Sequence, residues 1–212
     1  MKLPAMPALK PKPAISKQRV FYSQPSSLKT DLMPLYQRTA KELAFTPAQV
    51  RAFAIVESDE KPFTPGGFPV SRLEVHHWKK HRIADRASMA FDKAVNSRNL
   101  DARWQQFEQM RAVNETAAIL SHSFGMFQIV GFNFRLCLCA DPVTFLNEMM
   151  TVEGQFKMFK RFMLSSPALL SAVRRNRPDQ VGFHYNGPRY KLNKYDVKWA
   201  AASKAGGERV WA

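Results

Sequence analysis

The segment from Thr46 to Gln49 carries the clearest helix start in this chain. Thr46 suits the N-cap position, and Pro47 suits the first helical position, where a backbone donor is not needed. Gln49, three residues after the cap, can complete a capping box. The sequence therefore predicts where this helix begins and which of its side chains lie on the same face.

That phase leads to an unexpected carboxylate. Val50, Phe53 and Ala54 lie at i, i+3 and i+4 and predict a buried stripe, whose next position, i+7, is Glu57. Either the acid points into an apolar wall, or the end of the helix turns it to solvent. Position alone leaves both interpretations open.

The rest of the chain is mostly helical in pattern, with one expected β-hairpin. Pro65-Gly66-Gly67 predicts a turn between short extended pieces, the second ending in Val70–Val75. The fold class predicted is mainly α with a small β-hairpin. Further helices are expected over residues 26–43, 76–95, 100–120, 142–164, 167–175, 178–185 and 195–204.

Length and composition favour one folded domain. The chain has 212 residues, of which 45% are hydrophobic, enough for a sizeable core. Cys137 and Cys139 stand too close for an unstrained disulfide and lack a second pair for a metal site, so reduced thiols, in the core or partly buried, are expected. No apolar run reaches the length of a membrane span.

The charge is strongly positive, a formal +15, and indicates an anionic partner. Nucleic acid, anionic lipid and bacterial cell wall all qualify. Residues 1–30 hold six Lys or Arg, five Pro and no acid. We therefore expect a basic, flexible tail over residues 1–26, able to meet an anionic outer-membrane surface, followed by one domain over residues 27–212.

The first residues do not have the continuous apolar stretch of a signal peptide. The expectation is synthesis in a cytoplasm and, if the target is a cell wall, release by another agent.

Three short motifs follow one another along the chain. They are Glu57-Ser58, then Gly125–Gln128 preceded by Ser123, then Tyr185–Tyr190. Each has a structural explanation of its own: a helix end, a glycine between packed helices, and a helix stop with a turn. Their order in one chain is much more specific than any one of them.

Together these motifs resemble the lysozyme-like superfamily, and most closely the phage and bacterial N-acetylmuramidase family often found in endolysins. Goose-type lysozymes and soluble lytic transglycosylases are more distant relatives in the same superfamily. The matching segments are "AF" and "VES" at 52–58, "LEVH" at 73–76, "SFGMFQIVGFN" at 123–133, "YNGPRY" at 185–190 and "YDVKWA" at 195–200. The separate wall-binding module of many relatives has no counterpart here, and residues 84–115 match no motif.

The resemblance implies a lysozyme-like domain that hydrolyses the β-1,4 bond between N-acetylmuramic acid and N-acetylglucosamine. It places the general acid at Glu57, and burial on an apolar stripe would raise the pKa of this carboxyl as such an acid needs. Glu74 can hold a water for an inverting mechanism. Substrate-binding roles are expected for Ser58, His76, Ser123, Gln128, Tyr185, Asn186, Tyr190 and Asp196.

The second carboxylate stays open at this point. Asp59, Glu60 and Asp196 are rivals to Glu74, although Asp59 and Glu60 are expected to be solvated loop acids. With no base to hold a water, the 6-hydroxyl of the sugar can close on the anomeric carbon. One acid then suffices, and the outcome is that of a lytic transglycosylase.

No metal or other cofactor is expected. His77 and His81 lie one helical turn apart, but the neighbouring Lys79, Lys80 and Arg82 would repel a cation. A partly packed His76 near the substrate is the preferred interpretation.

An alternative from another class is a basic helical protein that binds nucleic acid. It accounts for the charge but gives no reason for Glu57, so the enzyme is preferred, with peptidoglycan glycan strands as its partner and a monomer as its state. Residues 155–163 place Phe156, Phe159 and Met163 on one face, which favours a core helix with a cationic rim over a membrane-active helix.

Overall fold

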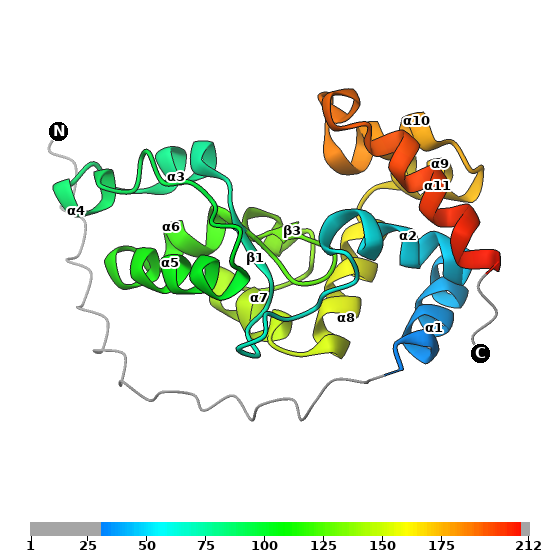
Figure 1. Ribbon diagram of the computed structural model, residues 1–212, viewed down its shortest axis with the longest axis horizontal. Coiled ribbons are helices and arrows are strands. Elements are labelled where there is room, and N and C mark those ends of the chain that lie inside the picture. The colour runs from blue at the N-terminus through cyan, green and yellow to red at the C-terminus, as the bar shows by residue number, and fades with distance from the viewer. Residues whose placement is uncertain (1–30, 209–212) are drawn as a thin grey trace, which may run out of the picture.

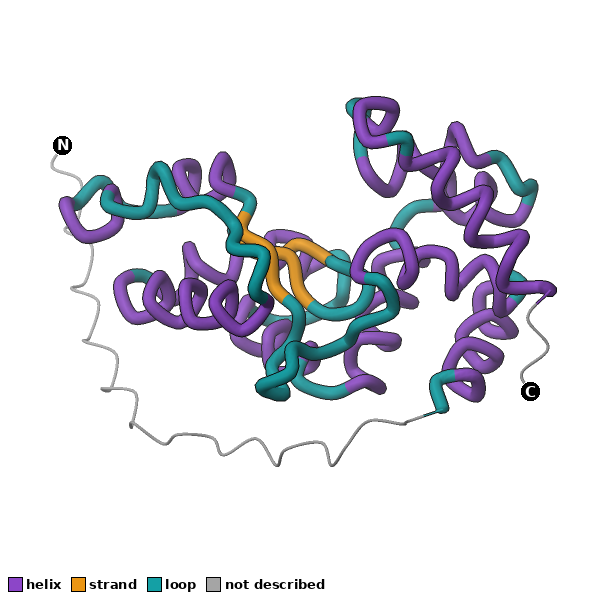
Figure 2. Tube along the Cα trace, in the orientation of Figure 1, coloured by secondary structure: helices purple, strands orange, loops and turns teal. Residues whose placement is uncertain are grey.

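A computed structural model describes residues 31–208 of the chain, with side chains up to residue 204. Helices lie on both sides of a three-stranded antiparallel sheet near the middle of the molecule (Figures 1 and 2). The elements are α1 (Met33–Leu43), α2 (Pro47–Ser58), β1 (Ser71–Leu73), α3 (Val75–His81), α4 (Arg86–Met89), α5 (Leu100–Val113), α6 (Glu115–Leu120), β2 (His122–Phe124), β3 (Ile129–Val130), η1 (Gly131–Arg135), α7 (Pro142–Met149), α8 (Val152–Leu164), α9 (Pro167–Arg174), α10 (Pro178–Val181), η2 (Gly182–Asn186), η3 (Tyr190–Asn193) and α11 (Tyr195–Glu208).

The predicted start of α2 is confirmed. The Thr46 hydroxyl accepts a hydrogen bond from the Gln49 backbone N–H at 3.1 Å, and the Gln49 side chain accepts one from the Thr46 N–H at 2.9 Å. Val50, Phe53 and Ala54 are fully buried, as the stripe requires. The first helix begins late, at Met33, with Pro34 in its first turn. The expected part of this helix before Asp31, and the basic tail, lie outside the described residues.

Several predicted helices are divided, because a polar cap begins a new helix within them. The expected 142–164 helix breaks at Thr151, whose hydroxyl accepts from the Gly154 N–H at 3.0 Å. The expected 100–120 helix breaks in the same way at Asn114, which caps α6. The 76–95 stretch holds α3 and α4, and the 178–185 stretch holds α10 and the start of η2. Spacing alone did not separate these pieces, because both sides of each break keep a helical pattern.

The sheet corrects the predicted hairpin. The turn at Pro65–Gly67 is closed by one bridge between Phe63 and Pro69, and the strand that follows ends at Leu73. Val75 already belongs to α3. The strand β1 pairs mainly with β2, far along the chain, and β2 pairs with β3. The Gly125–Gln128 motif is therefore the tight turn of a β-hairpin and not a contact between helices.

The segment over residues 84–115, which matches no motif, braces the free edge of β1. The Asn96 side chain accepts from the Leu73 N–H at 2.8 Å and donates to the Leu73 carbonyl at 3.0 Å. Asp101 accepts from the Gly66 N–H at 2.9 Å, and Trp104 stacks on Phe68 with ring centroids 5.1 Å apart. This segment thus fixes both the turn and the strand that lead to Glu74.

The core interpretation of α8 is confirmed. Phe156, Phe159 and Met163 are buried, and Phe159 stacks on Phe127 of the β-turn at 4.1 Å. Cys137 and Cys139 are buried free thiols, as expected. No helix in residues 31–208 is long and apolar enough to span a membrane.

Glu60 differs from the expectation of a solvated loop acid. Its carboxylate forms two hydrogen bonds with the Arg51 guanidinium, at 2.7 and 2.6 Å, and accepts a third from the Tyr36 hydroxyl at 3.0 Å. The Arg51 side chain is 8% exposed. The left-handed backbone at Asp59 and Glu60 turns the chain back so that Glu60 reaches this cation. Asp59 is exposed and pairs with Lys61, as predicted.

We expect Glu60→Gln to lower the free energy of unfolding by about 3 kcal/mol, because it removes the carboxylate from a buried guanidinium. Urea denaturation followed by circular dichroism measures this. The matched control is Asp59→Asn at the adjacent exposed pair, for which a change below about 0.5 kcal/mol is expected. Equal effects of the two variants would contradict a stabilising role for the Arg51–Glu60 pair.

Candidate active site

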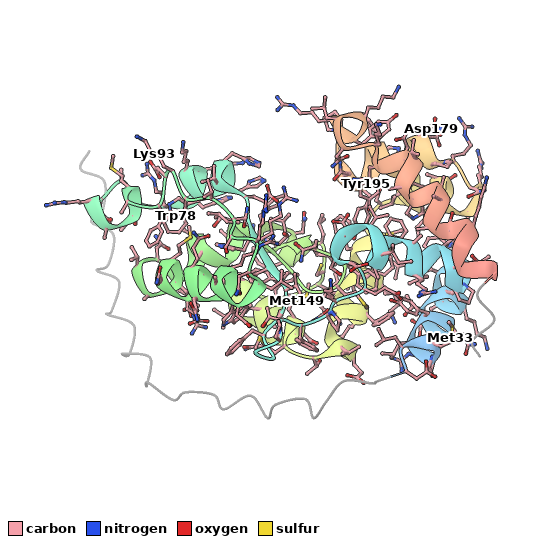
Figure 3. All side chains as sticks on the ribbon, viewed as in Figure 1. Met33, Trp78, Lys93, Met149, Asp179 and Tyr195 are labelled. Atoms are coloured by element: carbon pink, nitrogen blue, oxygen red, sulfur yellow. The ribbon has the colours of Figure 1, made fainter. Side chains whose placement is uncertain are left out.

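Glu57 lies in the last turn of α2, half-buried, beside the first residue of α11. The Tyr195 hydroxyl donates a hydrogen bond to Glu57 Oε1 at 2.8 Å. Tyr195 stands on the side of the α9–α11 group that faces the end of α2 (Figure 3). Because Oε1 accepts this bond, a proton on the carboxyl is carried by Oε2, which leaves one defined atom to give it up.

Burial raises the pKa of Glu57 from its ordinary 4.5 to about 7. The hydrogen bond from Tyr195 and the charge of Arg72 act in the opposite direction, while the charge of Glu74 raises the pKa further. The carboxyl is therefore substantially protonated near neutral pH. This is the protonation state that a general acid needs, and the buried stripe on α2 is its physical cause.

Ser58 joins the end of α2 to the sheet. Its hydroxyl donates to the Met126 carbonyl at 2.8 Å and accepts from the Lys61 N–H at 3.1 Å. The Met126 N–H is held in turn by the buried Gln155 side chain at 2.7 Å. Gly125 has a φ of +73°, and a Cβ there would lie 2.7 Å from the Gln155 side chain. The turn over Gly125–Gln128 is thus held by Gln155 in a position where the Met126 carbonyl can accept the hydrogen bond from Ser58.

Ser123 and Gln128 hold the strands together. The Gln128 amide donates to the Val70 carbonyl at 3.1 Å and to the Gly125 carbonyl at 2.8 Å, and its oxygen accepts from Ser123 at 2.8 Å. Both amide donors of Gln128 are therefore engaged within the protein. A sugar can reach only the remaining acceptor capacity of its oxygen, so the substrate-binding role of these two residues stays a prediction.

Two tyrosines form the wall behind Glu57. The rings of Tyr185 and Tyr195 stack with centroids 6.0 Å apart, and Tyr185 also packs on Phe53 at 4.6 Å. The Tyr185 hydroxyl donates to the Phe127 carbonyl at 2.8 Å. Burial raises the pKa of both phenols well above the ordinary value, so both remain neutral donors.

The other residues of the last motifs are placed differently. Asn186 is exposed, and its amide lies 3.5 Å from Asn193. The Tyr190 ring is buried against Gly182, where a Cβ would approach the ring to 2.5 Å. Asp196 is partly exposed in the first turn of α11, next to Tyr195. Asn186 and Asp196 are open to a ligand, whereas the face of Tyr190 is used in packing.

Glu74 follows β1 and precedes α3, and it is half-buried. Its Oε1 lies 3.6 Å from Arg72 Nε, and its N–H donates to the Ser121 carbonyl at 2.8 Å. The structure brings its charge close enough to Glu57 to affect the pKa of that acid. Asp59 and Glu60 have their own cations and do not act on Glu57 in this way.

The histidines gather along α3. His76 is exposed, which corrects the expectation of a partly packed side chain; its ring centroid is 4.1 Å from that of His77. The packed histidine is His77, whose ring centroid lies 4.4 Å from that of Phe132. Burial, with neighbouring positive charges, lowers the pKa of His77 to about 4. Within residues 31–208, no three His, Cys, Asp or Glu side chains gather in a way that could hold a metal ion.

Sequence reasoning missed four positioning residues: Tyr195, Arg72, Asn96 and Gln155. Tyr195 lies within the matching segment "YDVKWA", where the sequence indicates the neighbouring acid Asp196 as the residue that binds substrate. The other three act through contacts with residues more than 20 positions away or through charge alone. No local sequence pattern predicts contacts between residues that are so far apart in the chain.

An acid of raised pKa at the end of a helix, beside a small antiparallel sheet within a helical fold, is the arrangement expected of a glycoside hydrolase of the lysozyme-like class. Residues 46–205 match the N-acetylmuramidase family, and the chain belongs to this family of peptidoglycan-degrading enzymes. The predicted family, fold class and enzyme class are thereby confirmed.

One solved structure supports the same fold. The chain is similar to the crystal structure of an endolysin from the Burkholderia AP3 phage, with 28% sequence identity and a TM-score of 0.68. The similarity covers 82% of this chain and 70% of that endolysin. A comparison with curated proteins gave no match.

Tyr195→Phe should shift the alkaline limb of the activity profile to higher pH. The Tyr195 hydrogen bond favours the ionised carboxylate of Glu57. Its loss therefore raises the pKa of Glu57 above about 7, so the carboxyl stays protonated up to a higher pH. The pH dependence of kcat/KM on purified peptidoglycan measures this. Tyr185→Phe is the control, because its hydroxyl bonds to Phe127. An identical limb in Tyr195→Phe and the unaltered enzyme would contradict this role.

Proposed function

We propose that this N-acetylmuramidase acts as an endolysin and hydrolyses the β-1,4 bond between N-acetylmuramic acid and N-acetylglucosamine, with Glu57 as general acid. The observation that carries the proposal is the Glu57 carboxyl itself. It has a pKa of about 7, a fixed hydrogen bond on Oε1 and a free Oε2. Oε2 gives its proton to the glycosidic oxygen as the bond to the anomeric carbon breaks.

Glu74 is the proposed second carboxylate, acting as the base that holds a water on the far face of the sugar. Support comes from its half-buried position after β1 and from the Arg72 side chain, whose Nε lies 3.6 Å from Glu74 Oε1 and orients this carboxylate. The water attacks the anomeric carbon while Glu74 takes its proton, so the configuration inverts. The intramolecular route to a 1,6-anhydro sugar is the competing outcome, since it needs Glu57 alone.

The setting proposed is synthesis in the host cytoplasm followed by action on the periplasmic wall after release. The similarity to a phage endolysin and the formal charge of +15 support it. Residues 1–26 are proposed to approach the anionic outer-membrane surface, and the enzyme to work as a monomer. Removal of residues 1–26 should reduce clearing of intact cells while purified wall is still cut, and equal loss on both would contradict the proposal.

Glu57→Gln tests the general acid, because it keeps the shape of the side chain and removes the proton donor. We expect turbidity clearing of permeabilised Gram-negative cells to fall by about 100-fold or more. Glu153→Gln, an exposed acid of α8, is the matched control and should clear normally. Clearing by Glu57→Gln at the rate of the control would end the assignment.

Glu74→Gln tests the second carboxylate through its products. The unaltered enzyme should release hydrolysed reducing ends, and the variant should release them at least about tenfold more slowly, because the water is no longer activated. Mass spectrometry of digested wall counts hydrolysed and anhydro ends. Anhydro ends alone from the unaltered enzyme would show a lytic transglycosylase instead and remove Glu74 from the mechanism.

A further inference from the structure

Arg72 extends from the sheet face that carries the active site. Side chains alternate along a strand, and in β1 the neighbours Ser71 and Leu73 are buried whereas the Arg72 side chain is 62% exposed. The register pairs Arg72 with Ser123, and Ser123 with Val130, so these three residues lie on the same face of the sheet, where Ser123 is buried and Arg72 is exposed.

The charge of Arg72 is incompletely neutralised by the protein. Its ion pair with Glu74 is long, at 3.6 Å, and both side chains are open to water. A second cation, Arg103, lies near enough for the charge of Arg72 to lower its pKa, in addition to the larger effect of burial. Arg103 is held by its Nε, which donates to the Ser97 carbonyl at 2.5 Å. In the part of the chain that the structure describes, no carboxylate forms an ion pair with Arg103.

The positive charge of Arg72 lowers the pKa of Glu57 and so opposes the effect of burial. A cation beside Glu57 favours the ionised carboxylate, although catalysis needs the protonated one. The opposition is removed if the substrate itself brings a negative charge to Arg72. The sugar rings of the glycan strand are uncharged, and the carboxylates of peptidoglycan lie in the stem peptide attached to the lactyl group of muramic acid. A guanidinium binds carboxylates through two parallel hydrogen bonds.

We propose that Arg72, supported by the neighbouring charge of Arg103, binds a carboxylate of the stem peptide and makes the enzyme select acidic over amidated stem peptides. The inference rests on the proposed function, because it assigns the site around Glu57 to muramic acid. Substrate binding then neutralises Arg72 and relieves its effect on Glu57. The acid is accordingly more fully protonated in the complex than in the free enzyme.

The experiment compares two tetrasaccharides of alternating N-acetylglucosamine and N-acetylmuramic acid. In one, the lactyl groups carry a dipeptide ending in glutamate, and in the other both carboxyls of that glutamate are amidated. We expect the unaltered enzyme to prefer the acidic substrate in kcat/KM by about tenfold, equivalent to about 1.4 kcal/mol. Arg72→Gln should reduce this preference to near one, and Arg72→Lys should keep part of it.

Arg175→Gln, an exposed residue at the end of α9, is the control with the same change of charge and should keep the preference. The ratio between the substrates is informative, because an effect of Arg72 on Glu57 or Glu74 alone would change both rates equally. Equal cleavage of the two substrates by the unaltered enzyme would overturn the inference and leave the proposed function intact. Equal losses in Arg72→Gln would also overturn it, and failure to cleave either substrate would end the proposed function as well.

Discussion

The hydrogen bond from the Ser58 hydroxyl to the Met126 carbonyl is the contact on which the active site depends. It fixes the last turn of α2 to the turn between β2 and β3, and Gln155 holds that turn from the core side. Glu57, one residue earlier, is thereby placed between the sheet and the first residue of α11. The end of α2, the turn between β2 and β3, and α8 are thus held together by hydrogen bonds although they are distant in sequence.

The burial that raises the pKa of Glu57 has a cost for the fold. The native state holds the proton up to pH about 7, whereas the unfolded chain loses it near 4.5. Between these values the native state binds more protons, so the free energy of unfolding decreases as pH rises. The Arg51–Glu60 pair close by contributes stability that depends on an ionised carboxylate instead.

The sequence was sufficient for the class of fold and for the burial of Glu57, the proposed acid, because both follow from local rules. The capping box set the phase of α2, and the phase set the burial of Glu57. The β1–β2 pairing was missed, since its partners lie about fifty residues apart and the strands are only three residues long. Glu60 was misjudged for a related reason. Its partner Arg51 occupies a helix position that spacing alone describes as one more polar residue.

Asn96 has a consequence beyond the support of Glu74. β1 is an edge strand, and an open edge offers backbone donors and acceptors to any extended chain that approaches it. The Asn96 amide takes up both the N–H and the carbonyl of Leu73, as a neighbouring peptide group would. One side chain therefore closes the sheet against strand addition by a second copy of the protein. The same two hydrogen bonds thereby remove one route to aggregation from the exposed edge of the sheet.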